Sequence, residues 1–397
     1  MGMNTTPKGE RVHIALFGKR NAGKSSLINK ITGQELAIVS EIKGTTTDPV
    51  YKAMELLPLG PVMFVDTPGL DDEGELGEMR IEKTKKVLRK TDIAILVVDA
   101  TDQGDFKLEE QLEKELKKRQ IACLWVYNKA ELLQQRDSKK QGIYCSTKTE
   151  EGIEKIKEWI AAQVVDAEKQ PLVQDLVEKG DMVILVVPID SAAPKGRLIL
   201  PQQQVIRDLL EKGAIPIVVR DTELGIVLKK LGKMPKMVIT DSQAFEQVAK
   251  QVPKEIPLTS FSILMARYKG NLALLAKNAG KLDTLKDGDV ILMAEGCTHH
   301  RQCDDIGTVK IPKWMQAYTG KKLIFETASG GGYPDDLSKY AMVVHCGGCM
   351  LPAREMQFRM KHTLEQNIAI VNYGVLIAYM KGIVQRSLQL FPECGNE

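Results

Sequence analysis

Short apolar runs alternate with amphipathic segments along most of the chain, a pattern typical of strands alternating with helices. In the first part, apolar runs predict strands at residues 12–17, 61–65, 93–98 and 124–127. Isoleucines three and four residues apart in the segment 151–164 then predict a helix. This alternation indicates an α/β fold built on a parallel sheet.

The alternation resumes after a charged stretch that Pro171 interrupts. The expected strands are 182–187, 215–219 and 237–239, and the expected helices are 202–210, 222–231 and 242–252. From residue 257 the pattern predicts helices at 261–268 and 271–279, followed by strands at 290–294, 323–327 and 341–344. The expected α/β protein therefore has these parts: residues 1–165, a linker at 166–180, a middle parallel-sheet domain at 181–256 and a C-terminal domain at 257–397.

The first predicted strand runs directly into the segment 18–25, GKRNAGKS. This segment matches the phosphate-loop pattern GxxxxGK[ST] between a strand and a helix. Its glycines let backbone N–H groups surround phosphates, Lys24 places its charge on the outer phosphates, and the Ser25 hydroxyl is a natural Mg²⁺ ligand. The pattern predicts a P-loop nucleotide-binding domain, and a turn that binds no ligand is the alternative.

Two further blocks complete the phosphate side of the predicted site. The block DTPG follows the second predicted strand, so Asp66 can organise the magnesium shell and Gly69 can offer its N–H group to the terminal phosphate. The polar loop GTTTD lies between the P-loop and this block. In that loop we expect Thr46 to bind Mg²⁺, with Thr45 or Thr47 as alternatives.

Two later blocks, NKAE at 128–131 and STK at 146–148, are expected to select guanine. Together the four blocks resemble translation-factor-type GTPases, in the branch of tRNA-modification and ribosome-assembly GTPases, over residues 11–165. That family usually has Asp where this chain has Glu131. A Glu carboxylate can still accept two hydrogen bonds from the guanine edge, so guanine remains the expected base, with weaker discrimination.

The same resemblance implies a potassium ion in the site. In the resembled branch, an Asn at the position of Asn21 often accompanies K⁺ that bridges phosphate oxygens; an Asn that stabilises the loop is the alternative. Leu70 cannot orient water as the glutamine of Ras-like enzymes does, so slow, potassium-stimulated hydrolysis is expected. The expected GTP-binding residues are Gly18, Asn21, Ala22, Gly23, Lys24, Ser25, Ser26, Asp66, Gly69, Asn128, Lys129, Glu131, Ser146, Thr147 and Lys148. The expected catalytic residues are Lys24, Thr46, Asp66 and Gly69.

Composition narrows the class of protein. The chain is 43% hydrophobic and 27% charged, as in globular proteins, and its formal net charge of +3 gives no strong general attraction for nucleic acid. Apolar runs such as 182–187 are too short to span a bilayer. We therefore expect no nucleic-acid or membrane partner. With no apolar signal region and seven cysteines, the chain is expected to be cytoplasmic, with reduced thiols and metal ligation in place of disulfides.

Metal-ligand residue types cluster late in the chain, in CTH at 297–299 and HCGGC at 345–349. Thiols and imidazoles hold zinc or iron–sulfur clusters, and both blocks follow predicted strands, whose carboxyl ends converge in a parallel sheet. Spacing alone leaves open a Cys₃His zinc site and a 4Fe–4S cluster on Cys297, Cys346 and Cys349. The remaining cysteines are interpreted as structural or surface residues: Cys123, Cys145, Cys303 and Cys394.

A GTPase region followed by a middle domain and a CxH…HCxxC signature resembles HydF, the family of FeFe-hydrogenase maturation GTPases, over essentially the whole chain. The resemblance implies a 4Fe–4S cluster held by Cys297, Cys346 and Cys349, with His299 and His345 beside the open iron. It also implies a scaffold or carrier for the two-iron precursor of the hydrogenase active site. Such a carrier works with two radical-SAM maturation enzymes and delivers to apo FeFe-hydrogenase.

Asp190 is a third candidate for the fourth cluster ligand, because it follows a predicted strand and a carboxylate is a displaceable iron ligand. Capping of a turn is the alternative role. The middle domain has no His, Cys or phosphate loop, so we expect it to join two protomers into a homodimer. The alternative function for the chain is an RNA-modification or ribosome-assembly GTPase with a structural zinc site, although no basic run with interleaved aromatics is present.

Overall fold

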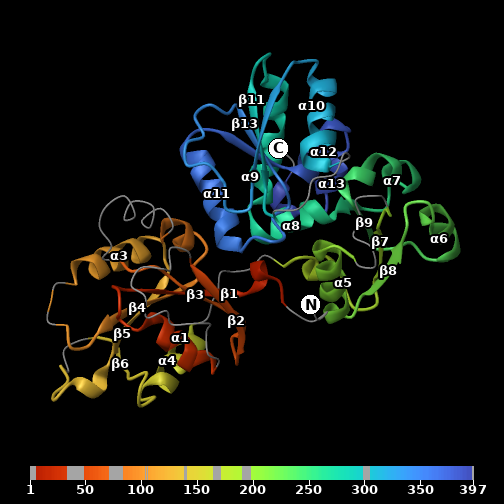
Figure 1. Cartoon of the computed structure of the whole chain (residues 1–397). Coiled ribbons are helices and arrows are strands. Elements are labelled where there is room, and N and C mark those ends of the chain that lie inside the picture. The colour runs from red at the N-terminus through yellow and green to blue at the C-terminus, as the bar shows by residue number, and fades with distance from the viewer. Residues whose placement is uncertain are drawn as a thin grey trace. The chain divides into compact units, whose positions relative to one another are not determined.

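The structure is a computed structural model of the chain (Figure 1). It describes residues 6–33, 49–70, 84–102, 104, 106–137, 141–163, 171–189, 198–297 and 305–395. The chain forms two compact units, Met1–Ala167 and Glu168–Glu397, and each unit has its own fold.

The first unit is built on a six-stranded sheet. Its strands are β1 Val12–Phe17, β2 Val50–Leu56, β3 Gly60–Asp66, β4 Ile93–Asp99, β5 Ala122–Asn128 and β6 Ile143–Tyr144. They lie in the order β2–β3–β1–β4–β5–β6, with β2 antiparallel to β3 and the other pairs parallel. The sequence pattern did not predict β2, in which exposed and buried positions alternate irregularly.

Helices cover both faces of this sheet because successive residues of a strand point to opposite sides. Ile14 and Leu16 of β1 share one core with α1 (Lys24–Thr32) and α4 (Ile153–Ala162), whereas Ala15 and Phe17 belong to a second core that includes Leu116 of α3 (Lys107–Lys118). The helix expected at 151–164 is α4, with Ile153, Ile156 and Ile160 buried. This architecture confirms the predicted P-loop GTPase fold.

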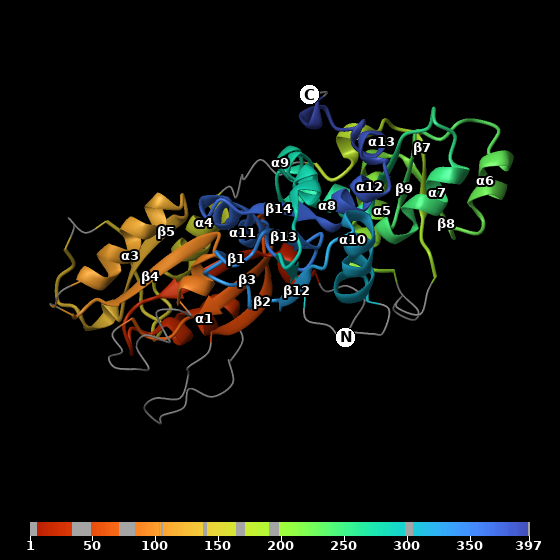
Figure 2. The same cartoon turned by 90° about the horizontal axis from the view of Figure 1, so that it is seen from above.

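The second unit contains two parallel four-stranded sheets (Figure 2). The first has β7 Met182–Val186, β8 Ile215–Val219, β9 Met237–Thr240 and β10 Leu258–Ser260, in the order β10–β9–β7–β8. The second has β11 Val290–Glu295, β12 Ile324–Ser329, β13 Met342–His345 and β14 Ala369–Asn372, in the order β12–β11–β13–β14. The predicted parallel-sheet α/β class is therefore confirmed for this unit as well.

Helices follow the strands of both sheets. They are α5 Leu200–Lys212, α6 Leu224–Lys230, α7 Phe245–Gln251, α8 Phe261–Lys269, α9 Leu272–Asn278, α10 Ile311–Thr319, α11 Ala353–Glu365, α12 Tyr373–Met380 and α13 Val384–Leu388. The short turns of this unit include η4 Ser242–Ala244 and the single π-helical turn η6 Ile306–Lys310. The side chains of Ser260 and Asn372 accept backbone N–H groups of α8 and α12, so each helix begins at the residue after its strand.

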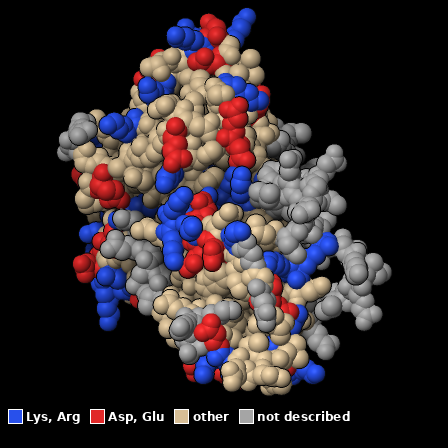
Figure 3. Space-filling view, turned by 90° about the vertical axis from the view of Figure 1, so that its left-hand side faces the viewer, with Lys and Arg blue, Asp and Glu red and all other residues tan. Residues whose placement is uncertain are grey.

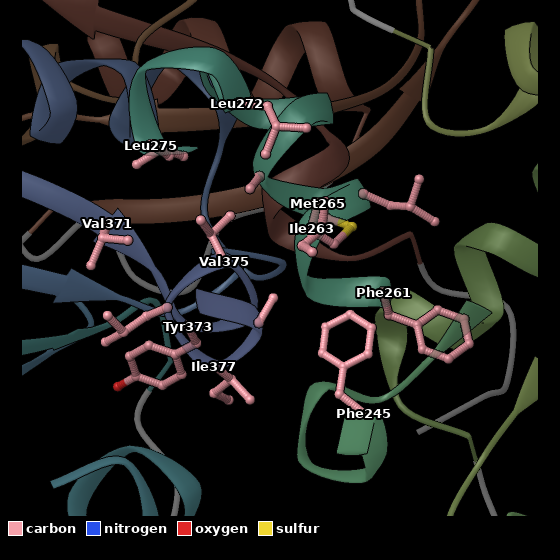
Figure 4. Packing of buried hydrophobic residues seen from close by; sticks show 14 of the residues in the cluster. Phe245, Phe261, Ile263, Met265, Leu272, Leu275, Val371, Tyr373, Val375 and Ile377 are labelled. Atoms are coloured by element: carbon pink, nitrogen blue, oxygen red, sulfur yellow. The ribbon is translucent and has the colours of Figure 1, made fainter. Parts of the chain in front are cut away.

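The two sheets of the second unit share one hydrophobic core. Helix α8 is buried on almost every side, lies between the sheets with α12 (Figures 1 and 2), and packs its Phe261 against Phe245 of α7 (Figure 4). The sequence pattern placed a boundary at residue 256, whereas the structure joins both sheets in one compact unit. The reason is that α8 supplies apolar side chains to the core on both sides of that boundary.

No helix among the described residues is long and apolar enough to cross a membrane. The face of the molecule in Figure 3 carries Lys and Arg side chains interspersed with Asp and Glu side chains. This mixture agrees with the small net charge of +3 for the whole chain.

Candidate functional site

The phosphate loop joins β1 to α1, as its sequence predicts. Gly23 precedes α1 in the left-handed conformation, with φ of +93°, and a Cβ there would lie 2.1 Å from Nδ2 of Asn128. Only glycine fits this close approach. Lys24 is 8% exposed, and its Nζ donates to the carbonyl oxygens of Gly18 at 2.8 Å and Lys19 at 2.9 Å. The amine is therefore held over the loop, where a nucleotide's phosphates would lie.

Ser25 and Asp66 meet at the start of α1 and the end of β3. The Ser25 hydroxyl donates a hydrogen bond to Oδ2 of Asp66, while the buried Oδ1 of Asp66 has no hydrogen-bond partner. Burial raises the pKa of Asp66, against the lowering effects of the Ser25 hydrogen bond and the Lys24 charge. A buried carboxylate oxygen without a partner is costly, and a hydroxyl beside a carboxylate is a donor set suited to Mg²⁺. Thr46, the other predicted ligand, lies outside the described residues.

The segment after β3 contacts the phosphate loop directly. Thr67 donates its hydroxyl to the carbonyl oxygen of Leu16 at 2.6 Å, and the backbone N–H of Leu70 donates to the carbonyl oxygen of Gly18 at 3.2 Å. Gly69 is thereby held next to the loop, as its predicted role requires. Asn21 is exposed, adopts a φ of +56°, and its side chain makes no hydrogen bond to a residue that the structure describes.

The two predicted guanine blocks meet at Asn128, which is fully buried. Its Nδ2 donates to the carbonyl oxygen of Ala22 at 2.9 Å, and its Oδ1 accepts the backbone N–H of Thr147 at 3.3 Å. One side chain therefore ties the phosphate loop to the loop after β6. The Ser146 hydroxyl accepts the backbone N–H of Lys148 at 3.2 Å and holds that loop in a turn.

The residues after Asn128 form a short turn. Lys129 adopts a φ of +62°, and its Nζ lies 2.5 Å from Oδ2 of Asp99 at the end of β4. Glu131 lies in the following turn, Ala130–Leu132, with an exposed side chain. Its carboxylate is thus accessible to a base.

The two cysteine blocks lie at the carboxyl ends of adjacent central strands. Ala294 of β11 is in register with His345 of β13, and the backbone N–H of Cys346 donates to the carbonyl oxygen of Ala294 at 2.9 Å. The Sγ of Cys346 accepts the backbone N–H groups of Gly296 at 3.1 Å and Gly348 at 3.4 Å. The structure therefore brings together the two blocks that the sequence separates, and backbone donors surround one of the sulfur atoms.

Burial favours the thiol form of Cys346 and Cys297. It raises the pKa of Cys346 to about 12 and the pKa of Cys297 to about 11, and Cys349 contributes to both shifts. Within the described ranges, no group of three or more His, Cys, Asp and Glu side chains is arranged to hold a metal ion. His299 and Cys303 fall outside those ranges, as does Asp190.

His345 is fully buried, and both of its ring nitrogens have partners. Nη1 of Arg359 lies 3.0 Å from Nε2, and Nδ1 lies 2.7 Å from the carbonyl oxygen of Cys346. Since guanidinium only donates, Nε2 accepts and Nδ1 carries the proton. Burial, followed by the Arg359 charge, lowers the pKa of His345 to about 3. The sequence suggested His345 as a fourth cluster ligand. In this arrangement neither of its ring nitrogens is free to bind iron.

Sequence reasoning missed two buried cations that support the cysteine loop. Arg359 of α11 pairs with Glu355 at 3.0 Å in addition to its contact with His345. Lys269, the last residue of α8, donates from Nζ to the carbonyl oxygens of Cys349 and Leu351, both at 2.8 Å. Lys269 lies 80 residues from Cys349 in the sequence. Arg359 is in the helix that follows the loop, where it looks like an ordinary surface residue, so no local pattern marks either cation.

A buried tyrosine adds to the same end of the second sheet. Tyr373 follows β14 and is 5% exposed, and its hydroxyl has no hydrogen-bond partner. Burial, then the nearby Cys346, Glu295, Asp305 and Cys297, raises the pKa of Tyr373 well above its ordinary value. These groups therefore surround the phenol.

Comparisons with known proteins follow this division of the chain. A family model described as "50S ribosome-binding GTPase" matches residues 13–129. The models "Hydrogen maturase F dimerization domain" and "Hydrogen maturase F tetramerization domain" match residues 172–270 and 273–390. The first match coincides with the P-loop unit, and the other two cover most of the second unit, including the three cysteines.

Curated GTPases match about a third of the chain. GTPase Der of Kosmotoga olearia is 35% identical over 132 residues, or 32% of this chain and 29% of that protein. The tRNA modification GTPase MnmE of Nitrosomonas eutropha is 34% identical over 154 residues, or 36% of this chain and 33% of that protein. The chain thus spans about a third of these relatives' lengths. A solved structure of Aquifex aeolicus Era is 18% identical, with a TM-score of 0.34, covering 52% of this chain and 92% of that one.

The order of the matched domains decides the assignment. The two hydrogen maturase F domains follow one another directly and succeed a GTPase domain with an intact phosphate loop. The chain therefore belongs to the hydrogen maturase F family of hydrogenase maturation GTPases.

Proposed function

We propose that this GTPase is a scaffold that holds a 4Fe–4S cluster on Cys297, Cys346 and Cys349, and that assembles or delivers a two-iron precursor to apo FeFe-hydrogenase. The observation that carries the proposal is the meeting of the two cysteine blocks at the carboxyl ends of β11 and β13. We propose the two radical-SAM maturation enzymes and the hydrogenase as partners because the family resemblance implies them. We propose that this work takes place in the cytoplasm, where thiols are kept reduced.

The surroundings of the cysteines suit an anionic iron–sulfur cluster. Cys346 already accepts two backbone N–H groups, and hydrogen bonds to sulfur are among the features that tune such clusters. The raised thiol pKa values mean that a bound cation is needed to hold the sulfurs as thiolates. When bound, a cluster on three thiolates offers one iron with an exchangeable position. Since both nitrogens of His345 have partners, we propose His299 or Asp190 for that position.

For the nucleotide, we propose that Ser25, Asp66 and Thr46 hold Mg²⁺ and that Lys24 neutralises the outer phosphates. Gly69 donates its N–H group to the terminal phosphate, and Asn128, Lys129, Glu131 and Ser146 define the guanine pocket. The unpartnered Oδ1 of Asp66 supports the magnesium assignment.

The same proposal gives Asn21 the role of holding K⁺ against the phosphates. Its exposed side chain on the phosphate loop has no described hydrogen bond to give up. Replacing potassium by sodium should slow GTP turnover by the native chain. The turnover rate of Asn21→Ala should be the same in both salts. Equal rates in both salts would remove potassium from the mechanism.

Anaerobic purification tests the cluster. The native protein should show a broad visible absorption and contain about four iron atoms per chain. Each of Cys297→Ala, Cys346→Ala and Cys349→Ala should lose both signals. Cys394→Ala is the matched control, because Cys394 is a partly buried thiol of the same unit that lies in the C-terminal turn Pro392–Cys394.

The competing function is an RNA-modification or ribosome-assembly GTPase with a structural zinc site. It is favoured by the match to a ribosome-binding GTPase model and by the names of the curated relatives. The match to the ribosome-binding GTPase model ends at residue 129, within the first unit. A colourless protein containing one zinc ion, whose GTP hydrolysis rises with ribosomes or tRNA, would establish this function and overturn the scaffold proposal.

A further inference from the structure

Tyr373 is the buried polar group that the proposed chemistry leaves unused. It is 5% exposed, and its hydroxyl has no hydrogen-bond partner among the described residues. In Figure 4 its oxygen points away from the neighbouring apolar side chains of α12. A buried hydroxyl without a partner is unfavourable by about 1–3 kcal/mol, so a buried tyrosine of this kind usually has an acceptor.

The backbone places this hydroxyl at the cysteine site. His345 of β13 is in register with Asn372 of β14, so Cys346 and Tyr373 leave their adjacent strands side by side. Cys346 and Cys297 are among the groups close enough to the phenol to raise its pKa. The tyrosine and the cysteines therefore converge from three strands of one sheet.

A glycine lies close against the hydroxyl. A Cβ on Gly307, in the π-helical turn η6, would lie 2.5 Å from the Tyr373 hydroxyl and 2.6 Å from Oε1 of Glu295. No larger residue fits without moving both groups. Single π-helical turns are frequent at functional sites. In this turn, a side chain at position 307 would fill the space beside the Tyr373 hydroxyl.

We propose that the Tyr373 hydroxyl donates a hydrogen bond to a sulfur atom of the cluster bound by Cys297, Cys346 and Cys349, and thereby favours the reduced cluster. This inference rests on the proposed function. Reduction adds negative charge to the sulfurs, so a fixed donor stabilises the reduced form more than the oxidised form. The effect is strong because the donor is buried, where the dielectric constant is low.

The alternative is that Tyr373 only fills the core beneath the loop. Its ring does contribute to the shared hydrophobic cluster. A phenylalanine would fill the same volume and avoid a buried hydroxyl without a partner, so packing alone gives no reason for the oxygen.

The test compares Tyr373→Phe with the native chain after anaerobic purification. We expect the same iron content and the same visible absorption. The equilibrium constant for one-electron reduction should fall about tenfold, which is a shift of the midpoint potential by about 59 mV to more negative values. The matched control is Tyr340→Phe, because Tyr340 is 4% exposed in the same unit and donates its hydroxyl to Glu326 at 2.8 Å. Its midpoint potential should stay unchanged.

A second readout detects the bond itself. Pulsed electron-paramagnetic resonance of the reduced cluster after exchange into D₂O should show a deuteron coupling that Tyr373→Phe loses and Tyr340→Phe keeps. Equal potentials and equal couplings in Tyr373→Phe and the native chain would overturn the inference while leaving the cluster intact. A native chain without a cluster would instead contradict the proposed function.

Discussion

Individual buried polar side chains define both candidate sites. Lys24 and the unpartnered oxygen of Asp66 define the phosphate end of the nucleotide site, and Tyr373 and Arg359 surround the cysteine loop. Each is more costly to bury than an apolar residue of similar size, so each indicates a ligand or a partner. Predictions at this scale concern single atoms.

Lys24→Ala should reduce GTP hydrolysis by at least about 100-fold, because it removes the charge that stabilises the transferred phosphoryl group. The iron–sulfur absorption should remain, since the cysteines are in the other compact unit. Phosphate release and visible absorption measure the two effects. Lys30→Ala is the control, because Lys30 is a lysine of the same helix that pairs with exposed Glu150. Loss of the cluster in Lys24→Ala would show that the two sites depend on each other.

His13 gives the first unit a dependence on pH. Burial lowers its pKa from 6.5 to about 4, partly opposed by its hydrogen bond to the Arg11 carbonyl. The unfolded chain therefore binds a proton below about pH 6.5 that the folded chain resists, so stability is full above that pH and falls as pH drops toward 4. The free energy of unfolding falls by at most about 1.4 kcal/mol per pH unit.

Urea unfolding of the full chain at about pH 7 and about pH 5 measures this dependence. His13→Asn keeps a donor for the Arg11 carbonyl but cannot titrate, so it should lose less stability between the two pH values than the native chain does. His362→Asn, at a partly exposed site of the second unit, is the control and should behave like the native chain. An identical pH dependence in His13→Asn would contradict the assignment.

At the scale of elements, parallel strands carry the chemistry at their ends, and an edge strand exposes apolar side chains. Strand β8 is an edge strand of the first sheet in the second unit, and its Ile215 and Val218 are 50% and 46% exposed. Exposed apolar edge strands invite pairing with another chain. The family match over this region is to a dimerization domain.

Val218→Lys should therefore convert a dimer into a monomer, because a charge at the paired edge would be buried without a partner. Light scattering coupled to gel filtration measures the mass of the full chain. Leu132→Lys is the control, because Leu132 is an aliphatic residue of the first unit that is 60% exposed. If Val218→Lys has the same mass as the native chain, the edge of β8 is not the interface.

At the scale of the whole molecule, we expect the second unit to unfold as one body, because its two sheets share one core. Phe261 of α8 is 2% exposed and belongs to the core that both sheets share. Phe261→Ala should destabilise this unit by about 3–5 kcal/mol, because it leaves a cavity in that core. Hydrogen exchange should then rise together in β7–β10 and in β11–β14, while the first unit keeps its protection. A rise confined to β7–β10 would support a domain boundary near residue 256 instead.

The sequence by itself determined the features that depend on neighbouring residues. The strand, loop and helix at residues 12–32, the blocks at Asp66 and Asn128, and the two cysteine blocks are all local patterns, and the structure places each at a strand end. Alternation of apolar and polar positions predicted most strands and helices because that periodicity is fixed by which face is buried. The GTPase half of the function follows from these local patterns.

Only the tertiary structure decided which distant residues meet. Short strands such as β10, with three residues, carry too little periodicity to be predicted, and the buried charges of Lys269 and Arg359 look like ordinary helix-surface residues in the sequence. Their positions depend on how β11, β13 and β14 are ordered and on the packing of α8 between two sheets. The same ordering brings Tyr373 to Cys346 and encloses His345, because contacts across a sheet depend on strand order and register, which no local pattern specifies.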